Sequence, residues 1–174
     1  MAHVVFLRAA NVGGKNVFRP ARLAAELSHL DVVNVGAAGT FVVRGKASAA
    51  AIRREIVERL PFEPDLSIQP AKDVVALVRS RPFRGTMFSK DLRGWVAALC
   101  GRANQQPELP LVVSRNGQWC FRFERIEGSF AIGLWRRPIG AFTLPSNVVE
   151  EALGVPATVR WYETYERIVE VLDA

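Results

Sequence analysis

The order of predicted strands and helices over residues 3–70 constrains the fold of this chain more than any other feature. Apolar, β-rich runs predict strands, and they cover residues 3–10, 31–36, 40–45 and 65–69. The spacing of apolar residues predicts helices over 19–30, with Pro20 in the first turn, and over 47–60. The order βαββαβ is typical of a ferredoxin-like sheet with both helices on one face.

The second half of the chain is rich in predicted antiparallel strands. After a helix over 71–81, we expect strands at 92–100, 109–115, 118–125 and 129–135. Asn116-Gly117 separates two of these strands and is a strong indication of a hairpin. Alternating aromatic residues in 118–125 indicate a strand with one buried face and one face in water.

Two helices are predicted near the C-terminus, over 146–154 with Ser146 as the N-cap and over 163–172. Segments 139–142 and 158–161 are candidate edge strands. The sequence therefore predicts an α+β protein, with a ferredoxin-like (βαββαβ) N-terminal half packed with a second half rich in antiparallel sheet. The expected parts are a ferredoxin-like subdomain at 1–70, a connecting helix and loop at 71–90, and an antiparallel sheet with C-terminal helices at 91–174.

The composition and the net charge indicate a cellular location for the protein and the kinds of partner that it could bind. The sequence has no apolar run of the roughly 18–20 residues that a membrane helix needs, and its N-terminus lacks a signal-peptide pattern. We therefore expect a cytoplasmic protein with no membrane partner. The net charge of +6 makes nucleic acid a candidate partner, although 19 of the 23 basic residues are arginine, a bias that a GC-rich genome also produces. The oligomeric state is not predicted.

The two cysteines, Cys100 and Cys120, are expected to be free and buried, because a free cysteine packs like a small hydrophobic residue. A structural zinc site needs four ligands in paired spacing, and besides these cysteines the chain has only His3 and His29. We therefore predict no metal and no cofactor.

The loop NVGGKN, residues 11–16, joins the first predicted strand to the first predicted helix. Backbone N–H groups at such a junction and the helix dipole favour an anion. Gly13 and Gly14 permit positive φ and close approach of a ligand, Lys15 adds a positive charge, and Arg8 adds a guanidinium fork. The loop matches neither the Walker pattern GxxxxGK[ST] nor GxGxxG.

An alternative explanation of the same loop needs no ligand. The glycines then solve a problem of backbone geometry, and Asn11 and Asn16 bond to local backbone groups. Both explanations stay open at this point.

Four segments carry a resemblance to a known family: LRAANVGGKN at 7–16, VGAAGTFVV at 35–43, RPF at 81–83 and ALGVPATVR at 152–160. In their order and spacing the chain resembles the bacterial domain-of-unknown-function family numbered sixteen ninety-seven. The resemblance implies two α+β halves, of which the first is ferredoxin-like. It implies no activity.

The chain departs from that family's pattern at two places. Members usually carry Gln-Ser-Gly-Asn where this chain has Ala37-Ala38-Gly39-Thr40, and they tend to carry Arg-Asn-Trp-Asn-Thr where it has Arg160-Trp161-Tyr162-Glu163-Thr164. Gly39, Thr40 and Arg160 are therefore only secondary candidates for a site shared with the glycine loop.

Two aromatic residues suggest a further candidate surface. In a ferredoxin-like sheet the first and third strands are central, so Phe6 and Phe41 are expected side by side, where RNA-recognition modules stack bases. The glycine-aromatic pattern of those modules is missing, and packing in the core is the alternative.

The resulting function hypothesis is a cytoplasmic protein that binds a phosphate-bearing ligand at residues 11–16. The ligand is a nucleotide, a phosphorylated metabolite or a nucleic-acid backbone. One alternative is an enzyme of unknown reaction that uses a cleft between the two halves. Another is a structural or interaction protein with no small ligand. Catalytic residues are not predicted.

Overall fold

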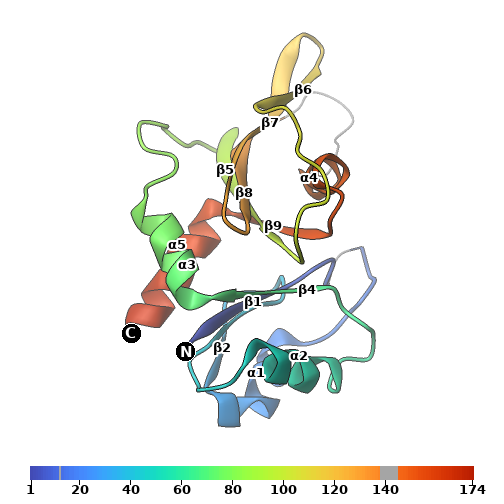
Figure 1. Ribbon diagram of the computed structural model, residues 1–174, viewed down its shortest axis with the longest axis vertical. Coiled ribbons are helices and arrows are strands. Elements are labelled where there is room, and N and C mark those ends of the chain that lie inside the picture. The colour runs from blue at the N-terminus through green and yellow to red at the C-terminus, as the bar shows by residue number, and fades with distance from the viewer. Residues whose placement is uncertain (12, 138–144) are drawn as a thin grey trace. The chain divides into compact units, whose positions relative to one another are not determined.

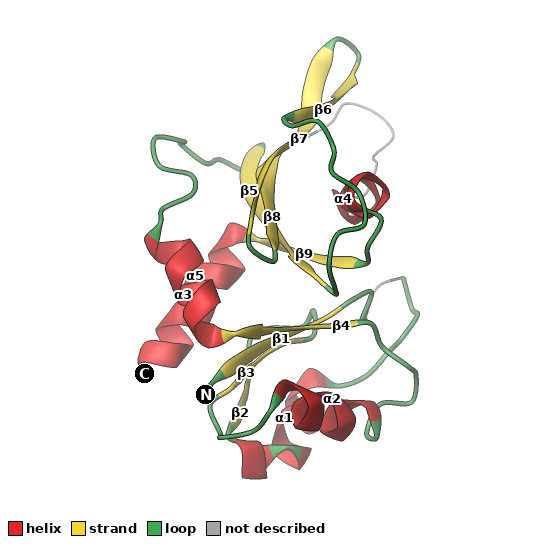
Figure 2. Ribbon diagram, in the orientation of Figure 1, coloured by secondary structure: helices red, strands yellow, loops and turns green. Residues whose placement is uncertain are grey.

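A computed structural model describes residues 1–11, 13–137 and 145–174 (Figure 1). Within these residues the protein is α+β, with two antiparallel sheets and five α-helices (Figure 2). Its contacts divide the chain into two compact units: Met1–Arg79 together with Thr164–Ala174, and Ser80–Glu163. The candidate strand at 139–142 and Val12 of the glycine loop lie outside the described residues.

The first unit contains a four-stranded sheet in the order β2-β3-β1-β4. Its elements are β1 (His3–Leu7), α1 (Pro20–Glu26), β2 (Val32–Asn34), β3 (Thr40–Val43), α2 (Ala49–Val57), β4 (Leu66–Pro70) and α3 (Ala71–Arg79). All neighbouring strands in this sheet are antiparallel, and β1 and β3 are the two central strands. The predicted order of strands and helices over this region is confirmed.

Most elements of this unit are shorter than predicted, and the first strand and the first helix show how they end. The strand predicted over 3–10 ends at Leu7, because Ala9 has a φ of 51° in the left-handed region and turns the chain away from the sheet. The helix predicted over 19–30 is α-helical only as far as Glu26 and continues as a 3₁₀ turn at Ser28–Leu30.

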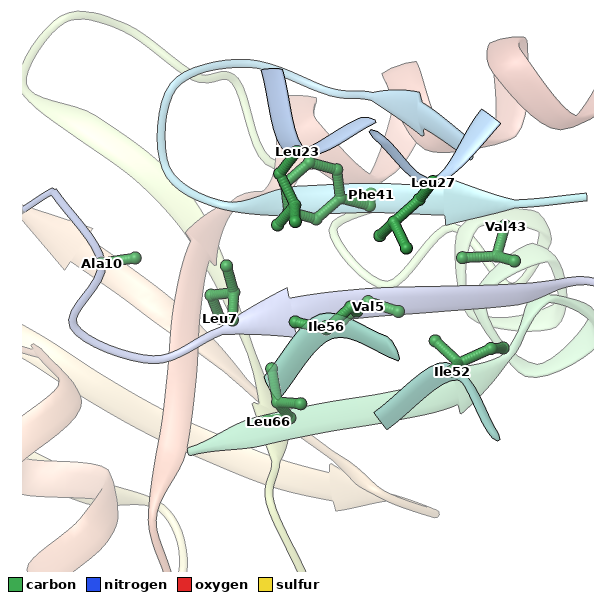
Figure 3. Close-up of a cluster of buried hydrophobic side chains, with 10 residues drawn as sticks. All are labelled: Val5, Leu7, Ala10, Leu23, Leu27, Phe41, Val43, Ile52, Ile56 and Leu66. Atoms are coloured by element: carbon green, nitrogen blue, oxygen red, sulfur yellow. The ribbon is translucent and has the colours of Figure 1, made fainter. Parts of the chain in front are cut away.

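Both helices of the βαββαβ order pack on one face of the sheet (Figure 3). Leucines of the first helical segment and isoleucines of α2 lie against the central strands; the buried cluster is Val5, Leu7, Ala10, Leu23, Leu27, Phe41, Val43, Ile52, Ile56 and Leu66. Burying one such large side chain contributes about 1.5–3 kcal/mol. This face is therefore the main hydrophobic core of the first unit.

The opposite face of the sheet carries Phe6, whose ring stacks on Tyr165 with centroids 5.3 Å apart. The expectation that Phe6 and Phe41 lie side by side is wrong. The strand register places Phe41 opposite Val5 and Phe6 opposite Thr40, so the two rings point to different faces. Both side chains are at most 1% exposed, which also excludes stacking of bases on them.

The second unit contains a five-stranded sheet in the order β6-β7-β8-β5-β9. Its elements are β5 (Leu92–Leu99), β6 (Leu111–Arg115), β7 (Gln118–Glu127), β8 (Phe130–Arg136), α4 (Pro145–Leu153) and β9 (Ala157–Trp161). The hairpin at Asn116-Gly117 is confirmed, with φ of 49° and 75° at its two central residues. The edge strand predicted at 158–161 is confirmed as part of β9.

One predicted helix start is wrong. Helix α4 begins at Pro145, so Ser146 lies inside the first turn instead of at the N-cap. A proline fits this position because the first helical N–H has no partner within the helix.

The last helix, α5 (Tyr162–Asp173), runs from the second unit into the first. The contact-defined units thus join α3 and residues 164–174 to the N-terminal sheet. The sequence-based division at 1–70, 71–90 and 91–174 stays a prediction about folding subdomains.

Candidate functional site

The glycine loop is held in place by the side chains of its two asparagines. The Asn11 side chain accepts a hydrogen bond from the Phe18 N–H at 2.9 Å and donates one to the Ala37 carbonyl at 3.1 Å. The Asn16 side chain donates to the Ala9 carbonyl at 3.3 Å. The backbone N–H of Asn11 also donates to the carbonyl of Asn16, at 3.2 Å. These bonds to local backbone are what the ligand-free explanation of the loop expects of the asparagines.

The two glycines have a different role from the asparagines. Gly13 and Gly14 have φ of 59° and 72°, a region that other residues adopt at a cost of about 1–2 kcal/mol. A Cβ atom at either position meets nothing within 4 Å. The glycines are therefore required by the backbone and not by crowding, and the space beside them is open.

The two predicted cationic groups of the site, Lys15 and Arg8, differ in their ion pairing. Lys15 is exposed and forms no ion pair with any residue that the structure describes. The guanidinium of Arg8 lies 3.4 Å from a carboxylate oxygen of Asp65, and its backbone N–H donates to the Asp65 carbonyl at 3.0 Å. Arg8 is thus tied to the residue before β4, whereas the charge of Lys15 faces solvent.

The secondary candidates lie in two different units. Gly39 in the turn before β3 and Thr40, the first residue of β3, are both buried. The bond from Asn11 to Ala37 joins this turn to the glycine loop. Arg160 lies in β9 of the second unit, where its guanidinium donates to the Val159 carbonyl at 3.0 Å. Within the first unit, the loop and the turn are therefore neighbours.

Helix α1 adds little to an anion site at the glycines. It begins at Pro20, four positions after Asn16, and its N-cap residue Arg19 makes no capping bond with its side chain. The field of a helix dipole falls off within its first turn, and α1 has only seven residues. The strand–loop–helix order suggested that the helix N-terminus would help to bind an anion at the glycines. This geometry does not support that role for α1.

A groove of about 450 Å³ lies where the segment after the glycine loop meets α1 and the end of α2. Three arginines and one glutamate line it, and these are Arg19, Arg22, Arg59 and Glu26. The remaining lining residues are apolar, among them Phe18 and Leu60. The groove therefore combines an excess of positive charge with an apolar wall.

This groove was not predicted from the sequence. Arg19 and Arg22 are three residues apart at a predicted helix start, which places them on one face of the helix. That spacing is a usable indication of a basic helix face. Nothing local indicates that Arg59, from the end of another helix, lies beside them.

The described residues contain no candidate metal cluster and no helix that could span a membrane. They contain no group of three or more His, Cys, Asp or Glu side chains placed to hold a metal ion. None of the helices in this part of the chain has the length and apolar character needed to cross a bilayer. Cys100 and Cys120 are both free, the first half-buried and the second buried.

Comparisons with known proteins give one match. The family model described as "Protein of unknown function (DUF1697)" matches residues 1–118, which include all of the first sheet and the glycine loop. No curated protein matches the chain. No solved structure matches it either.

Proposed function

The chain belongs to the DUF1697 family, as its motifs suggested, and we propose that it is a binding protein for a phosphate-bearing ligand at the loop of residues 11–16. The ligand contacts are the backbone of Gly13 and Gly14 and the ammonium group of Lys15. Nucleotides, phosphorylated metabolites and nucleic-acid backbones all carry the required group. The family has no assigned function, so the proposal depends on the geometry of this loop.

The observation that carries the proposal is the open pair of left-handed glycines beside Lys15, which forms no ion pair with any described residue. Both glycines have positive φ with open space where a side chain would project, so a ligand can approach the backbone closely. Lys15 has no competing carboxylate among the described residues. The asparagine bonds hold the loop before a ligand arrives, which reduces the ordering cost of binding.

The strand order β2-β3-β1-β4 and the order βαββαβ support a finer description of the scaffold. We infer that the first unit is ferredoxin-like, with the loop at the end of a central strand. A cytoplasmic location is part of the proposal and agrees with two free cysteines. The alternatives of an enzyme with a cleft between the halves and of an interaction protein without a small ligand stay predictions.

The test is a thermal-shift screen of the wild type with inorganic phosphate, nucleotides, sugar phosphates and short single-stranded RNA and DNA. A ligand at 100 times its dissociation constant stabilises the fold by about 2.7 kcal/mol, which is enough to raise the melting temperature measurably. Lys15→Ala is expected to abolish the shift. Because Lys15 is exposed, its own removal should change stability by no more than about 0.5 kcal/mol.

Lys46→Ala is the matched control, because Lys46 is an exposed lysine of the same unit outside the loop. This variant should keep the full ligand-induced shift. The absence of any shift in the wild type, or a shift that Lys15→Ala retains, would contradict the proposal. Gly13 and Gly14 would then be needed only because the loop requires positive φ at these positions.

A further inference from the structure

We propose that the groove beside α1 and the end of α2 is a second binding site, for a small amphipathic anion. Such a ligand has one carboxylate, sulfonate or phosphate group on an aromatic or aliphatic body. This site is separate from the glycine loop, and it depends neither on Lys15 nor on the function proposed above.

The charge of the groove favours an anion. Its lining carries three arginines and one glutamate, so the net charge is +3 − 1 = +2. The guanidinium of Arg22 is paired with Glu26 at 2.8 Å, and that of Arg59 with Glu55 at 2.9 Å. Arg19, in contrast, forms no ion pair or hydrogen bond through its side chain with the residues that the structure describes. Arg19 is therefore the cation available to a ligand.

The end of α2 would normally repel an anion, because a helix C-terminus carries a partial negative charge. Here the carbonyls of the last turn already accept hydrogen bonds. The backbone N–H groups after the helix donate to the carbonyls of Arg54, Ile56 and Val57, at 3.0, 3.2 and 3.4 Å. The Arg59 guanidinium donates to the remaining one, of Glu55, at 2.8 Å. The unfavourable charge at this end of the groove is thus reduced.

The apolar wall of the groove explains why the ligand needs a hydrophobic body. Phe18, Leu60 and Pro61 line it, and Val17 extends it with a side chain that is 62% exposed. An exposed valine beside partly buried apolar residues leaves apolar surface that a ligand can cover. A volume of about 450 Å³ lies within the range of small-molecule sites in proteins.

The wall is also held in a fixed position. The N–H of Phe18 donates to the Asn11 side chain, and the Phe18 ring packs against Phe41 and Phe62 with centroids 6.4 and 6.1 Å away. One side of the groove is therefore anchored both to the glycine loop and to the core of the sheet. A preformed wall reduces the cost of ordering on binding.

The test uses 8-anilinonaphthalene-1-sulfonate (ANS), whose fluorescence rises when it enters an apolar site, and the full chain. The neutral analogue N-phenyl-1-naphthylamine has the same rings without the sulfonate and reports the apolar contribution alone. We expect saturable binding of ANS to the wild type and weaker binding of the neutral analogue. Arg19→Gln should weaken ANS binding roughly five- to tenfold, as expected for loss of one hydrogen bond at an exposed side chain, and leave binding of the analogue unchanged.

Two further variants complete the experiment. Val17→Ser should weaken both probes, because Val17 belongs to the apolar wall. Arg54→Gln is the matched control, since Arg54 is an exposed arginine of α2 outside the groove lining, and it should bind both probes as the wild type does. Equal urea midpoints for the wild type and all variants would show that the variants are equally stable. Differences in ANS binding then come from the groove and not from unfolding.

Three results would overturn the proposal: no saturable binding of ANS, equal loss of affinity in Arg19→Gln and Arg54→Gln, or equal affinity of the wild type for the two probes. Because none of these measurements involves Lys15 or inorganic phosphate, failure of the groove and failure of the loop proposal are distinguishable.

Discussion

The side-chain oxygen of Asn11 accepts a hydrogen bond from the backbone N–H of Phe18 at 2.9 Å and thereby closes the glycine loop. The amide nitrogen of the same side chain donates to Ala37, in the turn before β3. One asparagine thus fixes the loop, the neighbouring turn and a wall of the groove. Asn11 also has a φ of 55°, so the residue at this position must adopt the left-handed conformation.

Asn11→Ala should destabilise the protein by about 2–3 kcal/mol, since it removes two hydrogen bonds and places alanine in the left-handed region. Asn11→Gly loses the same bonds without the strain and should be destabilised by about 1 kcal/mol less than Asn11→Ala. Urea unfolding of both variants measures the difference. Equal midpoints for the two would show that the left-handed conformation at this residue contributes nothing to stability.

Gly39→Ala should be much more damaging than Gly13→Ala. A Cβ atom on Gly39 would lie 2.8 Å from the Cβ of Leu7 and 2.9 Å from its Cδ1, in addition to the strain of a φ of 74°. We expect a loss of about 2–4 kcal/mol. Gly13→Ala has open space and a similar φ, so its loss should be about 1 kcal/mol. If thermal or urea unfolding shows the same loss for both, crowding at Gly39 is not the cause.

Gly133→Ala should strongly destabilise the second sheet. Gly133 lies opposite Trp95 in the pairing of β8 with β5, and a Cβ there would overlap the Trp95 indole and the Arg122 carbonyl. Trp95 is fully buried, so the expected loss is about 3 kcal/mol or more. Gly101→Ala is the control, because its new methyl group meets only Val155 at 3.5 Å and should change stability by less than about 0.5 kcal/mol. Denaturant midpoints that moved equally would refute this reasoning.

The stability of the protein should fall in mildly acidic solution because of His3. Burial of the imidazole lowers its pKa from the ordinary value of 6.5, and its Nδ1 is buried without a hydrogen-bond partner among the described residues. The unfolded chain therefore binds a proton more readily than the folded chain, so the contribution is intact above pH 6.5 and is lost as the pH falls below it.

The measurement compares urea midpoints at pH 7.5 and 5.5 for the wild type and for His3→Gln. The wild type should lose more stability over this interval than the variant, which cannot titrate at this position. Parallel losses in the two proteins would mean that other groups account for the pH dependence.

Local patterns in the sequence were sufficient to predict the order of elements. The hairpin at Asn116-Gly117 follows from turn residues that favour positive φ, and the helix over residues 49–57 follows from the spacing of Ile52 and Ile56. These features depend on residues close together in the chain. For the same reason the NVGGKN stretch at residues 11–16 could be singled out without a structure.

Features that depend on distant parts of the chain could not be predicted in the same way. The faces of Phe6 and Phe41 depend on the register between β1 and β3, and a shift by one residue reverses every side chain of a strand. The groove requires Arg59 to meet Arg19, and the position of Asn11 depends on its bond to Ala37. Each of these three contacts joins residues far apart in the sequence, so no local sequence pattern predicts it.

The contact between Phe6 and Tyr165 has a consequence for how the protein is made. A ribosome synthesises the N-terminal strands first, and domains generally fold in the order in which they emerge. Tyr165 and the fully buried Ile168 belong to the same compact unit as those strands, yet they are synthesised only after residues 80–163 of the second unit. The first unit can therefore be completed only after the second unit has been synthesised, and until then the aromatic ring of Phe6 has no Tyr165 to stack on.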